Sequence, residues 1–192
     1  MSKTHGTTTV TALWRRLDTP GHDACRLIQI DSGWQLAGAA VFDHNGTVAQ
    51  LTYSVACDTA WKTQSGEVHG WIGTEMFDLV VRRSSDGGWH ANGAAVVGLE
   101  HCTDLDLGFT PATNLLSIRR LALEVGQAAE VPAAWLDVDD RRIAVLPQRY
   151  ERRSDTIYAY DAPSFDYHAS LEVTSAGFVR HYPGLWELET YH

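Results

Sequence analysis

Polar and apolar residues alternate through most of this chain, and that two-residue period is the feature that most constrains its fold. In a β-strand successive side chains point to opposite faces, so alternation predicts strands with one buried face. One such run has its apolar members at Leu51, Tyr53, Val55 and Cys57. Runs over 77–81 and 165–173 repeat the pattern. The alternation therefore predicts a fold built mainly from half-buried strands.

Turn-forming residues separate these runs and indicate how the strands connect. They are Asn45-Gly46, Asp86-Gly87-Gly88, Asp139-Asp140, Ser175-Ala176-Gly177 and Pro183-Gly184. Short strands, tight turns and no regular helical spacers are typical of antiparallel hairpins rather than of a parallel sheet. No linker divides the 192 residues, so we expect one domain over 1–192. The fold class is mainly antiparallel β, either all-β or α+β.

One segment departs from the strand pattern. Thr110 is a good helix N-cap, and Pro111 suits the first helical position. Leu115, Ile118 and Leu121 then follow at helical spacing. We therefore expect one short helix near 111–117, passing directly into a strand.

Composition and charge exclude several classes of protein. Hydrophobic residues make up 44% of the chain and charged residues 20%, which is enough to bury a core and rules out wholesale disorder. The net charge of −9 argues against binding to nucleic acid or to anionic membranes. No apolar run reaches the about 18 residues of a membrane span, and the polar N-terminus lacks the apolar stretch of a signal peptide. We therefore expect a cytoplasmic protein that is not an integral membrane protein.

The densest polar cluster lies at 98–106. Asp104 and Asp106 are two residues apart, so on a strand they share one face. They could bind a metal or act as acid and base, with His101 as a further candidate. Alternatively, one of them forms an ion pair with Arg119 or Arg120. The nine histidines and three cysteines lack metal-ligand spacing, and no nucleophile motif is present, so we expect no metal and no cofactor.

Tryptophan is unusually abundant, with seven in 192 residues. Its large ring has one N–H to satisfy, and it suits the walls of sites for apolar chains and sugar rings. Most of the seven can be core residues. Trp61 and Trp89 lie beside turns, where a cleft would open at a strand end, and we expect these two to contact a ligand.

Several stretches together resemble the bacterial family described as "putative glycolipid-binding". They are Trp14-Arg15-Arg16, 53–63, Gly87-Gly88-Trp89, 102–106, 110–121, Ala134-Trp135-Leu136, Gln148-Arg149-Tyr150 and 177–186. The resemblance keeps its order over nearly the whole chain. It implies a curved sheet or half-barrel similar to that of bacterial lipoprotein carriers, and a lipid or glycolipid as the partner.

Three functions remain open. The first is non-enzymatic binding of a lipid or glycolipid in an apolar, aromatic-lined cleft of a single curved sheet closed by the short helix. The second is an enzyme acting on a sugar or lipid through Asp104, Asp106 or His101. The third is a dimerising scaffold, with a homodimer formed through an apolar surface. The residues we expect to bind a ligand are Trp61, Trp89, Arg119, Arg120 and Tyr150. Those we expect to form a structural polar cluster are Asp104, Asp106 and Asn114.

Overall fold

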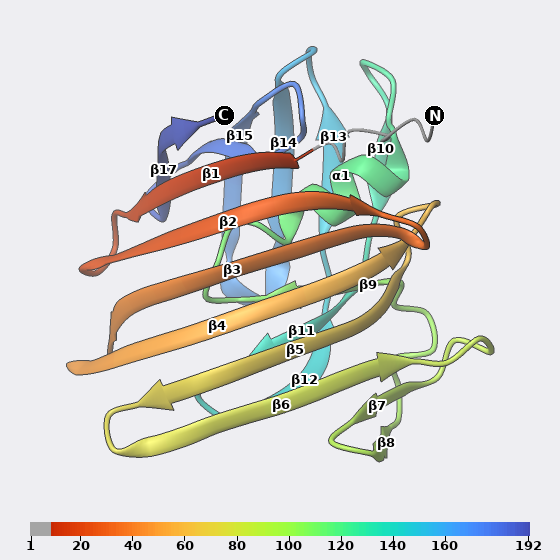
Figure 1. Cartoon of the computed structure of the whole chain (residues 1–192). Helices are drawn as coiled ribbons and strands as arrows, with labels where there is room; N and C mark the ends of the chain where they lie inside the picture. The colour runs from red at the N-terminus through yellow and green to blue at the C-terminus, as the bar shows by residue number, and fades with distance from the viewer. Residues whose placement is uncertain (1–8) are drawn as a thin grey trace, which may run out of the picture.

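A computed structural model of the chain describes residues 9–192, and most of these residues lie in one large curved sheet (Figure 1). The strands are β1 (Thr9–Arg16), β2 (Gly21–Ile30), β3 (Gly33–His44), β4 (Thr47–Asp58), β5 (Thr63–Ile72), β6 (Glu75–Arg83), β7 (Trp89–Ala91), β8 (Ala94–Val96), β9 (Asp104–Leu107), β10 (Ala128–Glu130), β11 (Ala133–Asp137), β12 (Arg142–Leu146), β13 (Arg149–Arg152), β14 (Ile157–Ala162), β15 (Tyr167–Val173), β16 (Val179–Tyr182) and β17 (Trp186–Tyr191). Fourteen of them form an antiparallel sheet in the order β10-β13-β14-β15-β16-β17-β1-β2-β3-β4-β5-β6-β7-β8. The expectation of a mainly antiparallel, curved sheet is confirmed.

The sheet bends so that β1–β6 form one wall and β13–β15 stand behind them (Figure 1). Its two ends, β10 and β8, are not paired with each other, so the sheet stays open. An open sheet of more than about ten strands curls or splits, because strand twist accumulates across it. The alternation sets the inner face: in β4, Leu51, Tyr53 and Val55 are buried, whereas the intervening residues are partly or fully exposed.

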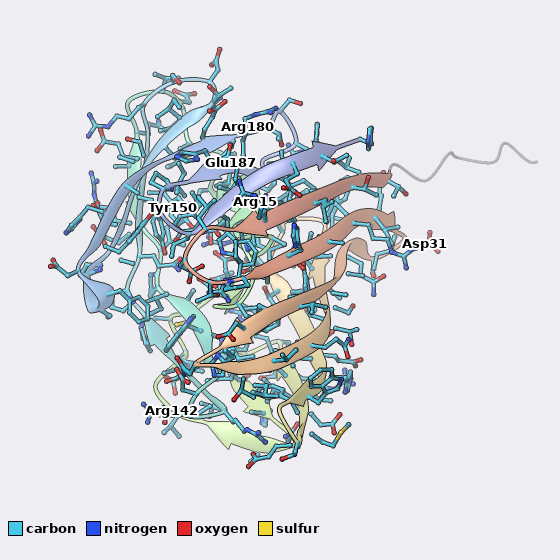
Figure 2. The ribbon with its side chains drawn as sticks, turned by 90° about the vertical axis from the view of Figure 1, so that its left-hand side faces the viewer. Arg15, Asp31, Arg142, Tyr150, Arg180 and Glu187 are labelled. Atoms are coloured by element: carbon cyan, nitrogen blue, oxygen red, sulfur yellow. The ribbon has the colours of Figure 1, made fainter. Side chains whose placement is uncertain are left out.

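A second layer covers the concave face of the large sheet. It consists of the three-stranded sheet β12-β11-β9 and one α-helix, α1 (Asn114–Leu121). Leu105 of β9 presses against Gly66 of β5, where an added Cβ would collide with the leucine side chain. Figure 2 shows Tyr150 between the two walls, whereas Arg142 and Arg180 lie at the outer surface. The sequence analysis did not foresee this second, three-stranded sheet, which lies against the concave face of the large curved sheet.

The connectivity of this inner layer also departs from the sequence analysis. β9 pairs with β11 in parallel, with Leu105 beside Ala134. The two strands are joined through α1 and β10 rather than through a tight turn, and a parallel pair requires such a crossover.

Helix α1 begins three residues later than its start was expected and does not continue into a strand. The turn before it is held by Thr110, whose Oγ1 accepts the Ala112 N–H at 3.0 Å. At its C-terminal end Ala122 adopts the left-handed conformation (φ 44°), and its N–H donates to the Ile118 carbonyl. This cap ends the helix, so Leu123 and Val125 lie in a loop despite their strand-like spacing. No helix within residues 9–192 has the length and apolarity needed to cross a bilayer.

A buried carboxyl group joins the large sheet to the loop before α1. Asp23 of β2 is 0% exposed. Its Oδ2 accepts hydrogen bonds from Tyr53 Oη, at 2.9 Å, and from Thr110 Oγ1. Its Oδ1 has no partner among the residues that the structure describes. Burial raises the pKa of Asp23 to about 7, against the opposing effect of these two hydrogen bonds.

The raised pKa makes the folding stability depend on pH. Because the folded state holds the Asp23 proton up to about pH 7 and the unfolded state releases it near the ordinary pKa of 3.8, stability should fall as pH rises through this interval. The loss is of the order of 4 kcal/mol. Asp23→Asn keeps an acceptor for Tyr53 and Thr110 and cannot ionise. We expect urea denaturation to show that this variant becomes more stable relative to wild type as the pH rises from 5 to 8, because only the wild type loses stability over this range. Parallel pH profiles for the two proteins would contradict this assignment.

A second buried carboxylate attaches α1 to β9. Asp104, whose side chain is 2% exposed, accepts two hydrogen bonds from Arg120, at 2.7 and 2.8 Å. Ser117 Oγ donates a third at 2.6 Å. Two parallel N–H···O bonds to one carboxylate form a strong, directional ion pair. The sequence analysis expected Asp104 or Asp106 to pair with one of the two arginines, and Arg120 forms that pair.

Removing the cation should therefore destabilise the fold. In Arg120→Met the buried Asp104 carboxylate loses its counter-ion, which costs about 3–5 kcal/mol. Arg119→Gln is the matched control on the same helix, because Arg119 has no ion pair among residues 9–192 and should change stability by less than about 1 kcal/mol. Chemical denaturation of both variants measures the difference. Equal stabilities of the two variants would show that the pair contributes little.

Candidate functional site

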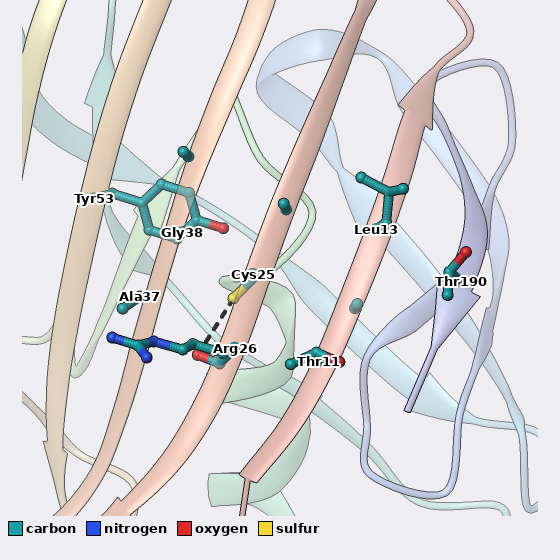
Figure 3. A pocket seen from close by; sticks show the side chains of 11 residues that line it. Thr11, Leu13, Cys25, Arg26, Ala37, Gly38, Tyr53 and Thr190 are labelled. Atoms are coloured by element: carbon teal, nitrogen blue, oxygen red, sulfur yellow. Dashed lines mark hydrogen bonds between the residues drawn. The ribbon is translucent and has the colours of Figure 1, made fainter.

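A hollow of about 610 Å³ lies on the convex face of β1–β4 and is lined mostly by short side chains (Figure 3). Leu13, Ala24, Ala37 and Ala39 are among its lining residues. Figure 3 shows Arg26 reaching toward the strand that carries Ala37. These residues leave a trough because small side chains cover the sheet thinly. In most small-molecule sites a few polar groups converge on one point, and in this hollow they do not.

A second hollow, of about 400 Å³, lies inside the curve of the sheet, and we call it the aromatic cavity. Its volume is within the range of about 300–1,000 Å³ usual for small-molecule sites. Strands of both sheets and the start of α1 contribute to it. It is lined by Arg16, Asp18, Asp106, Gly108, Thr110, Asn114, Trp135, Leu146, Tyr160, Ala162, Phe165, Tyr167, Tyr182, Leu185 and Trp186.

Aromatic rings form two walls of this cavity. On one side Tyr160, Tyr167 and Tyr182 contact one another, with ring centroids 5.5–6.2 Å apart. On the other, Trp135 meets Phe165 edge to face at 5.3 Å. Because the three tyrosine rings pack against one another, no ligand can enter between them. They offer a ligand one continuous aromatic surface.

Gly108 lets the Trp135 indole lie close to the backbone. A Cβ added at this glycine would come within 2.5 Å of Trp135 Nε1. Any larger residue at position 108 would therefore displace the indole ring.

Arg16 and Asp18 supply a charged pair at the mouth of the cavity. Arg16 donates to both carboxylate oxygens of Asp18, at 3.0 and 2.6 Å. Its guanidinium also lies 5.1 Å from the ring centres of Phe42 and Trp186. Arginine held between two aromatic faces loses little further freedom when it binds a ligand.

Asp106 is the carboxylate within the cavity. It accepts hydrogen bonds from Gln148 Nε2, at 2.5 Å, and from Thr113 Oγ1, at 3.3 Å. Burial raises its pKa to about 6, and these two hydrogen bonds oppose the rise. A carboxylate has about four acceptor positions, so about two remain for a ligand. Next to it, Asn114 donates to Tyr150 Oη at 2.8 Å, which fixes the orientation of the amide.

A smaller hollow of about 300 Å³ adjoins the aromatic cavity and shares five residues with it. The shared residues are Arg16, Asp18, Gly108, Trp135 and Phe165. Its far end is polar, where His44 Nε2 lies 3.0 Å from Asp139 Oδ1. The two hollows thus form one groove that runs from an aromatic end to a polar end.

Two of the residues expected to bind a ligand come together outside this groove. Trp61 stacks on Trp34, with ring centroids 4.7 Å apart and an interplanar angle of 13°. The Arg119 guanidinium lies 5.5 Å from the Trp61 ring centre. Trp61 has a positive φ of 64°, which is rare for a bulky residue and places the ring on Trp34.

The other three expected ligand-binding residues have structural contacts. Trp89 is 1% exposed and donates its indole N–H to the Cys102 carbonyl, so it belongs to the core rather than to a cavity wall. Arg120 is bound to Asp104, and Tyr150 is 1% exposed. None of the three lines the aromatic cavity.

The polar cluster is divided between structure and site. Asp104 is tied to Arg120, whereas Asp106 and Asn114 line the aromatic cavity. His101 is exposed in the loop before β9. Hence His101, Asp104 and Asp106 do not converge as the enzyme hypothesis requires. In the described range, 9–192, no three His, Cys, Asp or Glu side chains are grouped as metal ligands.

Most of the cavity residues were not found from the sequence. Trp135 and Trp186 belong to stretches that carry the family resemblance, yet nothing local distinguishes them from core tryptophans. They lie on β11 and β17, about fifty residues apart in the chain, and only the fold brings them to one cavity.

Comparison with known proteins supports the architecture. Residues 11–188 match the family described as "Putative glycolipid-binding". The crystal structure of a DUF1089 family protein from Pseudomonas aeruginosa superposes with a TM-score of 0.77. It shares 26% sequence identity, and the match covers 87% of this chain and 91% of that one. No curated protein matches the sequence. Because the family match spans nearly all of the described residues, the chain belongs to the "Putative glycolipid-binding" family.

Proposed function

We propose that the aromatic cavity binds the saccharide part of a glycolipid without chemical change. The observation that carries the proposal is the convergence of six aromatic residues with Asp106, Asn114 and the Arg16–Asp18 pair in one cavity. Aromatic faces stack on the C–H faces of sugar rings, while carboxylate, amide and guanidinium groups pair with hydroxyls. The family description agrees with this ligand class.

The filled interior limits how the rest of the ligand can bind. Within residues 9–192, β9, β11 and α1 cover the concave face and leave little room along it for an acyl chain. Phe165, which is 55% exposed, lies at the rim of the cavity. We therefore place the sugar inside the cavity and the apolar part of the ligand over this rim.

The wall formed by Trp135 gives the first test. Titration with octyl glucoside below its micellar concentration, followed by calorimetry, should show saturable binding to the wild type. Trp135→Ala should weaken it by about 1–3 kcal/mol, the scale of one large apolar contact. Trp71→Ala is the matched control, because Trp71 is a partly exposed tryptophan on β5 that lines neither hollow of the groove.

The test must distinguish binding of the sugar from binding of the octyl chain alone. A polyethylene glycol octyl ether supplies the same chain without the sugar, and it should bind more weakly than the glycoside. Equal binding of the two detergents, or equal affinity in wild type and Trp135→Ala, would reject the saccharide assignment.

Asp106 gives the second test, because its raised pKa makes sugar binding depend on pH. An ionised carboxylate is the stronger acceptor for sugar hydroxyls. We expect affinity for the glycoside to rise from pH 5 to pH 7.5 as Asp106 ionises at about pH 6. Asp106→Asn should remove this rise, since an amide does not titrate. A variant that keeps the wild-type pH dependence would show that another group is responsible.

A further inference from the structure

A separate small cavity, of about 230 Å³, lies at the C-terminal end of α1, and we call it the arginine pocket. Arg119, Arg152, Tyr158 and Ser175 contribute to it. It shares no lining residue with the aromatic cavity. Two guanidinium groups on one small cavity are notable in a chain whose net charge is −9.

Arg119 is an exposed side chain whose guanidinium contacts an aromatic ring rather than a counter-ion among residues 9–192. Within residues 9–192 it has no hydrogen bond and no ion pair, and its guanidinium lies 5.5 Å from the Trp61 ring centre. Its stem passes over Gly177, where an added Cβ would contact Arg119 Cγ and Cδ at 3.7 Å. Trp61 stacks in turn on Trp34, so this contact favours one position of the exposed Arg119 guanidinium, and no hydrogen-bond acceptor within residues 9–192 occupies its N–H groups.

Arg152 adds a second positive charge in a fixed position. It donates to the carbonyl oxygens of Leu123, Ser154 and Asp155, at 2.9, 3.1 and 3.3 Å. The acidic group that faces it is Asp155, 3.6 Å away, whose side chain is 94% exposed. An ion pair so open to water neutralises little of the arginine charge.

Tyr158 lines the arginine pocket together with the two arginines and carries a hydroxyl group. Its ring centre lies 6.0 Å from the Arg152 guanidinium. Burial raises the pKa of Tyr158, while the charges of Arg152 and Arg119 oppose the rise. In the described part of the chain this hydroxyl has no hydrogen-bond partner, and Ser175 adds an exposed hydroxyl.

We propose that the arginine pocket binds a phosphate group, with Arg119, Tyr158 and Ser175 donating to its oxygens and Arg152 supplying charge. Arginine suits phosphate because its planar fork matches two oxygens at once, and bonds to ionised groups are the strong ones. Donors on several sides fit a tetrahedral group better than a planar carboxylate. The proposal does not depend on the aromatic cavity.

Titration with inorganic phosphate tests the proposal directly. At constant ionic strength set with chloride, wild-type protein should show saturable binding by calorimetry, with a change in emission from Trp61. Arg119→Gln should weaken binding about tenfold, equivalent to the loss of one charge-assisted hydrogen bond. Tyr158→Phe, which keeps the ring, should weaken it less.

Arg180→Gln is the matched control, because Arg180 is an exposed arginine paired with Glu172 at 3.5 Å, and its loss should leave affinity unchanged. Melting curves confirm that each variant folds. No saturable binding of phosphate to the wild type, or equal affinity in wild type and Arg119→Gln, would overturn the proposal.

Two further probes distinguish the source of the phosphate. Glycerol 3-phosphate represents a soluble phosphate ester, and vesicles containing phosphatidic acid represent a lipid headgroup. Binding of the soluble ester that depends on Arg119 indicates a free metabolite. Binding to the vesicles that exceeds binding of the ester, and depends on Arg119, indicates a headgroup. Vesicle binding that survives Arg119→Gln would show a non-specific charge effect and count against the pocket.

Discussion

A sheet of fourteen strands that curves without closing has a large apolar concave face, and the rest of this structure follows from the need to cover it. The cover is the layer of β9, β11, β12 and α1. Close approach depends on small residues in the sheet, as where Leu105 meets Gly66. Gly38 likewise leaves room for the ring of Tyr53, which a Cβ at that position would strike. Burial of this face is the main stabilising contribution, because apolar area removed from water drives folding.

The same constraint decides where a ligand can bind. Since the inner layer fills most of the concavity, the remaining space lies where its ends leave the sheet. Asp106 and Asn114 face that space because β9 ends and α1 begins beside it. The polar groups that the inner layer cannot bury thus become the polar groups of the groove.

An open sheet also leaves backbone N–H and C=O groups unpaired along its edge strands, and side chains form hydrogen bonds with some of these groups. β6 pairs with β7 only over Val81–Arg83. Beyond this, Asn92 Oδ1 accepts the Val80 N–H at 2.8 Å, and its Nδ2 donates to the Asp78 carbonyl at 3.3 Å. Arg141 covers the Met76 carbonyl. A side chain that occupies the backbone hydrogen-bonding groups of an edge strand discourages pairing of this edge with another chain.

The period of the sequence predicted the strands because each long strand has one buried and one exposed face, as β4 does. It could not predict the inner layer, since β9 and β11 are short and mostly buried, without clear alternation, and their parallel pairing depends on a crossover. The pair of Asp104 with Arg120 was foreseeable, because few partners exist for a buried carboxylate. The cavity was not, because Trp135, Tyr167 and Trp186 meet only after the sheet has curved. Ala122 in the left-handed conformation also has no signal in the sequence, as glycine is the usual residue there.

Thr110 connects the core to the groove, and this limits how independently the two can change. Its Oγ1 accepts a hydrogen bond from the Ala112 N–H and donates one to the buried Asp23 carboxyl group. Thr110 also lines the aromatic cavity. A ligand that pulled this hydroxyl toward itself would remove one of the two hydrogen bonds to Asp23 and raise the pKa of that group further. Conversely, ionised Asp23 holds the hydroxyl more tightly and keeps it from the ligand. The protonation of a core residue and the polarity of the cavity are therefore coupled through one hydroxyl group.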